Sequence, residues 1–107
     1  MFKSSHNLAF ETAHWNSPFN DEGIQMFRVG TIEGLWRSTD KSYDIIAILN
    51  KDPGNGHLND LFEWFEQSCK RDKKYLRVLE IMSDEFFIHL TTKRGFVGNH
   101  KVLKKSF

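Results

Sequence analysis

The sequence predicts one α/β (α+β) domain, with a single mixed, mainly antiparallel sheet, one βαβ crossover and two main helices. Its 107 residues are enough for one hydrophobic core and too few for a separate second domain. The hydrophobic period also changes along the chain. The run Tyr43–Leu49 has the pattern of a strand, and apolar residues then recur at helical spacing from Leu58 to Cys69. A further strand pattern and a second helical pattern follow, so we expect helices packed on a sheet.

Each expected element has a local signal. Strands are expected at residues 7–15, 24–29, 31–37, 43–49 and 75–81. Residues 96–97 and 101–107 are expected to form a closing hairpin with its turn at Gly98 and Asn99. Residues 16–23 and 38–42 have loop composition, while Gly30 and Gly34 mark turn or bulge positions. Helices are expected at residues 56–70, before a polar link at 71–74, and from a Ser83 cap to about Arg94, where Gly95 ends the helix.

The order of these elements predicts how the strands pair. The most apolar strand, Tyr43–Leu49, is expected at the centre of the sheet. A strand, a helix and another strand imply a right-handed parallel crossover, whereas the flanking hairpins imply antiparallel pairs. On the strand that follows the first helix, Leu76, Val78 and Glu80 would share one face.

Composition indicates a folded chain outside the membrane. Hydrophobic residues make up 39% and charged residues 27%, which argues against disorder. The longest uncharged apolar run, Ile45–Leu49, is far shorter than a membrane span, and the first residues lack the apolar stretch of a signal peptide. We therefore expect a cytoplasmic protein, in the host cytoplasm if the protein is viral.

Cysteine and histidine usage does not predict a metal centre. The single Cys69 falls on the apolar face of the first helix, which favours a packing role over a nucleophilic one. The five histidines have no zinc-like spacing with one another or with Cys69.

Charge is unevenly distributed although the net charge is only +1. Residues 1–69 contain five Lys/Arg against ten Asp/Glu, and residues 70–107 contain ten against four. The basic part could face an anionic ligand, but lysines at the end of a helix also complement the helix dipole. No aromatic-interleaved basic stripe accompanies them in the sequence, so nucleic acid is not the expected partner.

The best candidate site is the loop 50–56 between the central strand and the first helix. Gly54 and Gly56 allow backbone N–H groups to point into a concavity, and the helix that follows adds its unpaired amides and the positive end of its dipole. These features suit an anionic group such as a phosphate. The same composition is also ordinary turn chemistry, and that alternative stays open.

Residues 31–107 resemble the GNAT superfamily of acetyl-coenzyme A-dependent N-acetyltransferases. The resemblance lies in the hairpin, the central strand that enters Pro53-Gly54-Asn55-Gly56, the helix, the strand 76–81, and the helix 87–96 that ends in a Gly95-Phe96 pair. It implies a minimal, phage-type member of that fold family, because residues 1–23 have no counterpart of the family's acceptor-binding helices. It also implies that acetyl-CoA is the cosubstrate and that no metal is needed.

The family's pyrophosphate loop, Arg/Gln-x-x-Gly-x-Gly/Ala, is similar to this loop in two registers. A start at Lys51 matches its glycines, and a start at Pro53 restores the helix phase, with Gly56 as the inner glycine. We favour the second register because the core sets helix phase. The residues that the resemblance assigns to coenzyme binding are Ile48, Leu49, Asn50, Gly54, Asn55, Gly56, His57, Leu58 and Asp84.

The resemblance also implies catalytic positions. The family's general acid is commonly a Tyr four residues before the glycine of Gly-Phe, and here that position is Thr91, a far weaker acid. Neighbouring His89, a water or the substrate would then supply the proton, although His89 could equally be a surface residue. Glu80 matches a general base of some members and could instead be a polar strand end, and Glu33 is a weaker candidate.

Two functions follow from the resemblance. The first is transfer of an acetyl group from acetyl-CoA to an amine, carried by a small molecule or a protein, with a homodimer as an open alternative. The second is a catalytically silent, GNAT-like interaction protein of viral or mobile-element type that binds a host or partner protein. The departures at Pro53, Leu58, Asp84 and Thr91 motivate the second. Exposure of Trp36 or Trp64 on one face would favour it.

Overall fold

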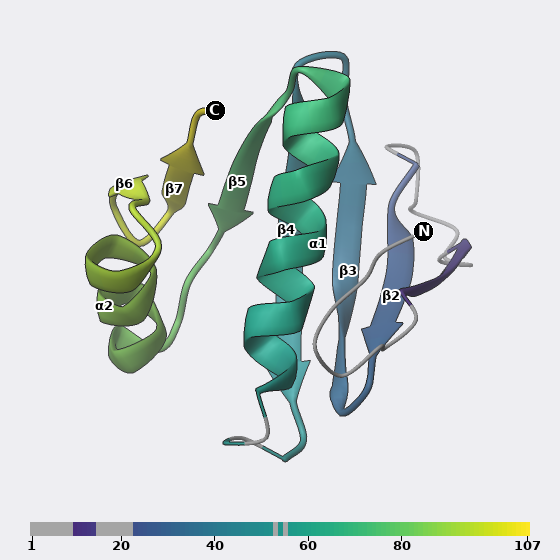
Figure 1. Ribbon diagram of the computed structural model, residues 1–107. Helices are drawn as coiled ribbons and strands as arrows, with labels where there is room; N and C mark the ends of the chain where they lie inside the picture. The colour runs from purple at the N-terminus through teal and green to yellow at the C-terminus, as the bar shows by residue number, and fades with distance from the viewer. Residues whose placement is uncertain (1–9, 15–22, 53, 55) are drawn as a thin grey trace.

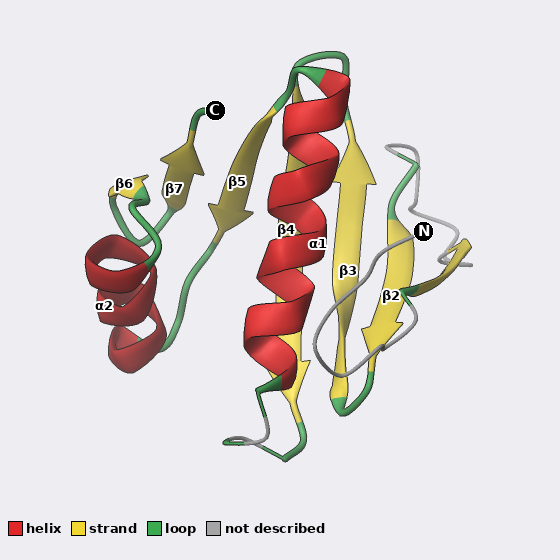
Figure 2. Ribbon diagram, in the orientation of Figure 1, coloured by secondary structure: helices red, strands yellow, loops and turns green. Residues whose placement is uncertain are grey.

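The structure is a computed structural model that describes residues 10–14, 23–52, 54 and 56–107. These residues form one seven-stranded sheet of order β1-β2-β3-β4-β5-β7-β6, with two helices (Figures 1 and 2). The elements are β1 Glu11–His14, β2 Gln25–Val29, β3 Ile32–Ser38, β4 Ser42–Asn50, α1 His57–Asp72, β5 Tyr75–Leu79, α2 Asp84–Lys93, β6 Val97–Gly98 and β7 Val102–Lys105.

The predicted fold class is confirmed at the level of sheet and helices. All neighbouring strands pair antiparallel except β4 and β5, which are parallel and joined through α1. The strand β4 holds the middle position, as its apolar composition predicts. With α1 in front of the sheet, β4 and β5 both point down and β5 lies to the left of β4, which is the right-handed sense of crossover (Figure 1).

Gly34 is not a bulge or a turn, contrary to the prediction from its type. It lies inside β3, where an added Cβ would be 2.1 Å from the carbonyl oxygen of Ala47 and 2.5 Å from the ring of Phe27. The irregularity lies one residue further on: Leu35 pairs with Ala47 and Trp36 with Ile45, so that Ile46 of β4 has no partner on β3. Glycine is therefore present at position 34 because a neighbouring backbone and ring approach closely.

The strand after α1 is shorter than predicted. Its ladder ends at Leu79 rather than Ile81, because Glu80 adopts a left-handed φ of 51°. The amides of Glu80 and Ile81 instead donate to the carbonyls of Lys101 and His100, at 3.0 and 2.7 Å. The prediction that Glu80 shares a strand face with Leu76 is thus wrong, since left-handed backbone breaks the alternation of faces.

The helix boundaries follow their caps. The helix α1 continues through Asp72, two residues beyond the predicted end, and stops at Lys73, which has a left-handed φ of 57°. The N-cap of α2 is Ser83, as predicted, and its side chain accepts a hydrogen bond from the amide of Phe86. Gly95 has a φ of 78°, as a helix stop requires.

The closing hairpin differs in detail from the prediction. Gly98 belongs to β6, and the turn is made by residues 99–101. The side-chain oxygen of Asn99 accepts hydrogen bonds from the amides of Lys101 and Val102, so these backbone donors have partners within the turn.

One aromatic-rich core lies between α1 and the sheet. Its fully buried members include Phe62, Phe65 and Cys69 of α1, which confirms the packing role expected for the cysteine. Trp36 is 8% exposed and Trp64 packs half-buried against the same core, stacked on Phe10. The two tryptophans therefore do not form an exposed face that would favour an interaction protein.

Candidate functional site

The principal cleft opens where the two central parallel strands separate. The pairing of β4 with β5 ends at Ile45 and Val78, after which β4 continues to Asn50. The space between them has a volume of about 640 Å³. Its lining consists of Ile45, Ile46, Ala47, Ile48, Asn50, Leu58, Val78, Leu79, Glu80, Ile81, Met82, Ser83, Glu85, Phe86 and His89.

Two local irregularities produce this separation. The unmatched Ile46 bends β4 away from a regular ladder, and left-handed Glu80 turns the chain out of β5. Residues 46–50 consequently have no partner on β5 along one edge of β4. The edge of a strand offers backbone donors and acceptors at regular spacing, which suits an extended ligand that carries amides.

The loop at the end of β4 has two glycines in left-handed conformations, which both an ordinary turn and an anion cradle can use. Gly54 and Gly56 have φ values of 92° and 84°, and Gly56 is the N-cap of α1 without a side-chain capping bond. The helix therefore presents its first amides and dipole end at the mouth of the cleft, which Leu58 lines. Pro53 and Asn55, which the sequence also assigns to this loop, lie outside the described residues.

The side chain of His57 is turned toward the β2–β3 hairpin. Its Nδ1 accepts a hydrogen bond from the amide of Thr31 at 3.1 Å and lies 3.1 Å from the Thr31 hydroxyl. Asn50 Oδ1 accepts from the same hydroxyl at 3.2 Å and from the amide of Asp52. The ends of the loop are thus tied to the hairpin, so that a contribution of His57 to a ligand at the helix start would come from its backbone.

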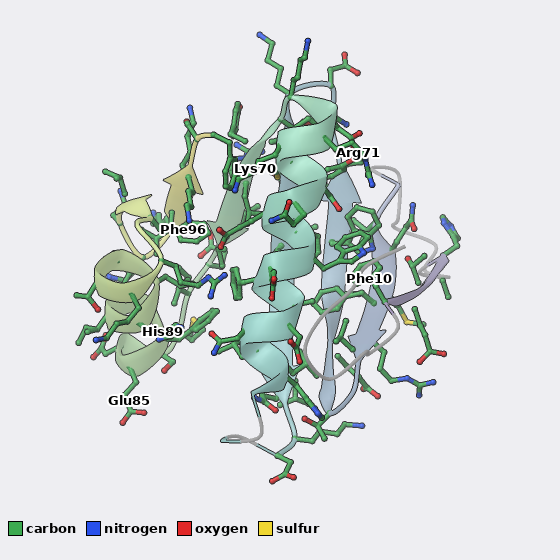
Figure 3. The ribbon with its side chains drawn as sticks, viewed as in Figure 1. Phe10, Lys70, Arg71, Glu85, His89 and Phe96 are labelled. Carbon is green, nitrogen blue, oxygen red and sulfur yellow. The ribbon has the colours of Figure 1, made fainter. Side chains whose placement is uncertain are left out.

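His89 lines the cleft and has a buried imidazole nitrogen. It lies between α2 and α1 (Figure 3), and its Nε2 is buried without a hydrogen-bond partner among the described residues. Burial, followed by the positive charges of Arg94 and Lys93, lowers the pKa of this histidine below its ordinary value. The imidazole is therefore mainly neutral near pH 7 and can accept a proton.

The remaining catalytic candidates are separated by the fold. Glu80 is exposed on the cleft lining. Thr91 is not on that lining, and its hydroxyl donates back to the carbonyls of Phe87 and Ile88 within its own helix, at 3.0 and 3.2 Å. Glu33 forms an ion pair with Lys51 at 3.0 Å, also away from the cleft.

Of the described residues assigned to coenzyme binding, the cleft lining includes Ile48, Asn50 and Leu58 and does not include Leu49, Gly54, Gly56, His57 or Asp84. Leu49 is 58% exposed and alternates with Ile48, which does line the cleft. The carboxylate of Asp84 lies 3.1 Å from Nε2 of His100, whose ring stacks on Phe87 with centroids 4.0 Å apart. The carboxylate therefore faces the β6–β7 turn.

Several cleft residues were missed by reasoning from the sequence. Ile45, Ile46, Val78 and Ile81 belong to apolar strand runs, which predict a core and carry no signal of a ligand site. Glu85, in the first turn of α2, also lines the cleft. Met82, the residue before the helix cap, would be expected to pack against its helix, yet it is 93% exposed.

Within the described ranges, no group of three or more His, Cys, Asp and Glu residues could hold a metal ion, and no helix is long and apolar enough to cross a membrane. Comparison of the chain with protein-family models, with curated proteins and with solved structures finds no match.

Proposed function

We propose that the protein transfers an acetyl group from acetyl-CoA to an amine acceptor. The observation that carries the proposal is the cleft between β4 and β5, whose lining includes His89 of α2, with a buried Nε2 that has no hydrogen-bond partner among the described residues. A cleft of this kind, with few polar groups set among apolar side chains, is a typical small-molecule site. The GNAT-like order of elements around it supplies the reaction class.

The cleft offers a distinct contact for each part of the coenzyme. The first amides of α1, reached through Gly54 and Gly56, suit the pyrophosphate. The free edge of β4 at residues 46–50 suits the amides of the pantetheine arm, which can bind as an added strand. Apolar side chains such as Val78 and Phe86 line the space where the arm would lie.

Starting from an ammonium group, the reaction requires three proton transfers. The amine nitrogen attacks the thioester carbonyl carbon, an N–C bond forms, the C–S bond breaks, and the nitrogen loses a proton while the thiolate gains one. Glu80, exposed on the cleft lining, receives a proton from the incoming ammonium group. Neutral His89 takes the proton that the nitrogen loses during attack and then delivers it to the thiolate. Thr91 has no part in this scheme, because its hydroxyl is bonded within α2.

Isothermal titration with acetyl-CoA tests the proposal. We expect saturable binding, competition by coenzyme A, and weaker binding of a pantetheine fragment that lacks the pyrophosphate. Absence of heat with millimolar acetyl-CoA would overturn both the cofactor and the enzyme assignment. A matched pair of variants, His89→Gln in the cleft and His14→Gln on the exposed strand β1, then separates catalysis from binding. Only the first should lose turnover with an amine panel, with its coenzyme affinity kept.

A second candidate is a silent GNAT-like protein that binds a host or partner protein. It is favoured by Thr91, which stands where the family has its acid and is bonded within its own helix. Acetyl-CoA binding without turnover of any amine, combined with equal behaviour of wild type and His89→Gln, would support this candidate over the enzyme.

A further inference from the structure

The fold gathers lysines and aromatic rings at one end of the domain. We call this surface the basic end and define it by Lys70, Lys73 and Lys74 around the end of α1, Lys104 of β7, and the rings of Tyr75 and Phe107. A shallow cavity of about 320 Å³ is lined by the three helix-end lysines, both rings, Cys69 and Ser106. Figure 3 shows Lys70 at the end of α1 that lies toward β5 and the last residues of the chain.

The lysines lie against the rings. Lys104 Nζ is 4.1 Å from the ring centroid of Tyr75, and Lys70 Nζ is 5.9 Å from that of Phe107. Lys74 likewise lies over Tyr43 at 4.6 Å. Phe107 is 47% exposed. Charge and aromatic surface are thus interleaved in space: Tyr75 follows the lysines at the end of α1, Phe107 lies near Lys104 in the sequence, and the fold sets Lys104 over Tyr75 and Lys70 near Phe107.

Within the described part of the chain, Lys74 Nζ donates to the Ser38 hydroxyl at 2.9 Å, and the nearby carboxylates have partners other than the lysines of the basic end. The carboxylate of Asp72 forms an ion pair with Arg71 and accepts a hydrogen bond from the Tyr43 hydroxyl. The carboxylate of Glu66 forms ion pairs with Arg94 and Lys105. Among the described residues, the four lysines of the basic end have no carboxylate within ion-pair distance. The helix dipole explains a lysine in the last turn of α1, but it does not explain Lys104, which comes from β7.

We propose that the basic end binds single-stranded nucleic acid. Unpaired lysines suit a phosphate backbone, and aromatic rings beside them suit unstacked bases, a combination typical of sequence-tolerant single-strand sites. An acidic peptide would use the charges without the rings, and duplex DNA would hide its bases from them. The site is separate from the cleft between β4 and β5, and it does not depend on the acetyltransferase proposal.

The test is fluorescence anisotropy with a labelled oligothymidylate of about 15 nucleotides, which covers a typical single-strand site. We expect the logarithm of the affinity to fall with the logarithm of salt concentration with a slope of about −3, from four phosphate contacts. The variant Lys70→Gln with Lys104→Gln should weaken binding and reduce the slope by about 1.4. Both side chains are exposed, and neither forms a hydrogen bond among those described.

Two further variants make the test specific. Lys93→Gln with Lys101→Gln removes the same charge from the end of α2 and the β6–β7 turn, and should leave affinity and slope nearly unchanged. Phe107→Ala should weaken binding about tenfold with the slope kept, because it removes a stacking surface. Thermal midpoints and circular dichroism spectra of each variant confirm that the fold is intact.

Three results would overturn the proposal. The first is no anisotropy change with the protein at about 100 μM in low salt, where even non-specific binders associate. The second is an equal loss of affinity in the two double-lysine variants, which would indicate that binding depends on the net charge of the protein and not on the basic end. The third is binding by Phe107→Ala as tight as wild type together with equal displacement by inorganic polyphosphate, which would indicate a general polyanion surface.

Discussion

Nδ1 of His57 accepts a hydrogen bond from the amide of Thr31 at 3.1 Å. This bond joins the first residue of α1 to the turn of the β2–β3 hairpin, and it sets the position of the helix start at the cleft. The turn can approach because the neighbouring residue is Gly30, with a φ of 56°. A Cβ at that position would lie 2.4 Å from the same Nδ1.

Gly30→Ala should therefore destabilise the protein and disturb the helix start. We expect a loss of about 2–4 kcal/mol, because a left-handed φ is combined with a steric clash. Gly23→Ala is the matched control, since Gly23 has a φ of 69° but nothing within 4 Å of an added Cβ. Its loss should be about 1 kcal/mol, from the dihedral alone. Urea unfolding measures both, and equal losses would show that the contact with His57 is unimportant.

Asp44 is a buried carboxylate on which stability at low pH should depend. It is 0% exposed and accepts hydrogen bonds from Arg37, Arg77 and Ser42, at 2.6–2.9 Å. Burial alone would raise its pKa, but these donors outweigh burial and the pKa is lowered. The native state then binds fewer protons than the unfolded state, so this stabilisation is present above a pH of about 4 and is lost as the pH falls through the native pKa.

Asp44→Asn should remove that dependence. We expect it to be less stable than wild type by about 2–4 kcal/mol at pH 7, since two arginines lose their shared partner, and the difference should shrink toward acid pH. Asp40→Asn, in the exposed turn before β4, is the control and should change stability by less than about 0.5 kcal/mol. Unfolding curves between pH 2 and 7 give the comparison. A constant difference between wild type and Asp44→Asn would contradict the pKa assignment.

Gly56→Val should weaken coenzyme binding. The φ of 84° at the N-cap of α1 is unfavourable for a β-branched residue, and the added side chain would block the approach of a pyrophosphate to the helix amides. We expect a loss of about 1–3 kcal/mol in acetyl-CoA affinity by calorimetry. Unchanged affinity in a folded variant would mean that the two glycines form only a turn.

Cys69→Ala is the control for that experiment. Cys69 is fully buried, and burial raises the pKa of its thiol to about 12, so the side chain acts as a packing residue. Its loss should reduce stability by about 1 kcal/mol through a small cavity and leave acetyl-CoA affinity unchanged. A fall in affinity without a loss of stability would link the thiol to the site.

The pH dependence of turnover should report on His89. Because the pKa of this histidine is lowered, the neutral base persists to below pH 6.5, and kcat should fall only as the pH drops further. His89→Gln should abolish that acid limb along with most of the activity. His100→Gln, which changes the exposed partner of Asp84, should keep both. An acid limb that persists in His89→Gln would assign it to another group, with Glu80 as the first candidate.

The elements of this fold could be predicted because their signals are local. Alternation of apolar residues, the switch to helical spacing after Gly56, the Ser83 cap and the Gly95 stop each act within a few residues. They determined the order of strands and helices, the parallel crossover and the burial of Cys69. They also indicated the loop at the start of α1, whose glycines have the φ values that an anion cradle needs.

The cleft and the basic end were decided by tertiary structure, because they depend on residues that meet only after folding. The bulge at Ile46 is set by the pairing of β3 with β4, and the end of β5 by the left-handed Glu80, neither of which has a hydrophobic signature. The packing of α2 in the folded protein buries Nε2 of His89, whereas the hydroxyl of Thr91, the other candidate on this helix, is bonded within α2. Lys104 and Tyr75 are far apart in sequence. The antiparallel pairing of β7 with β5 brings Nζ of Lys104 to 4.1 Å from the ring centroid of Tyr75.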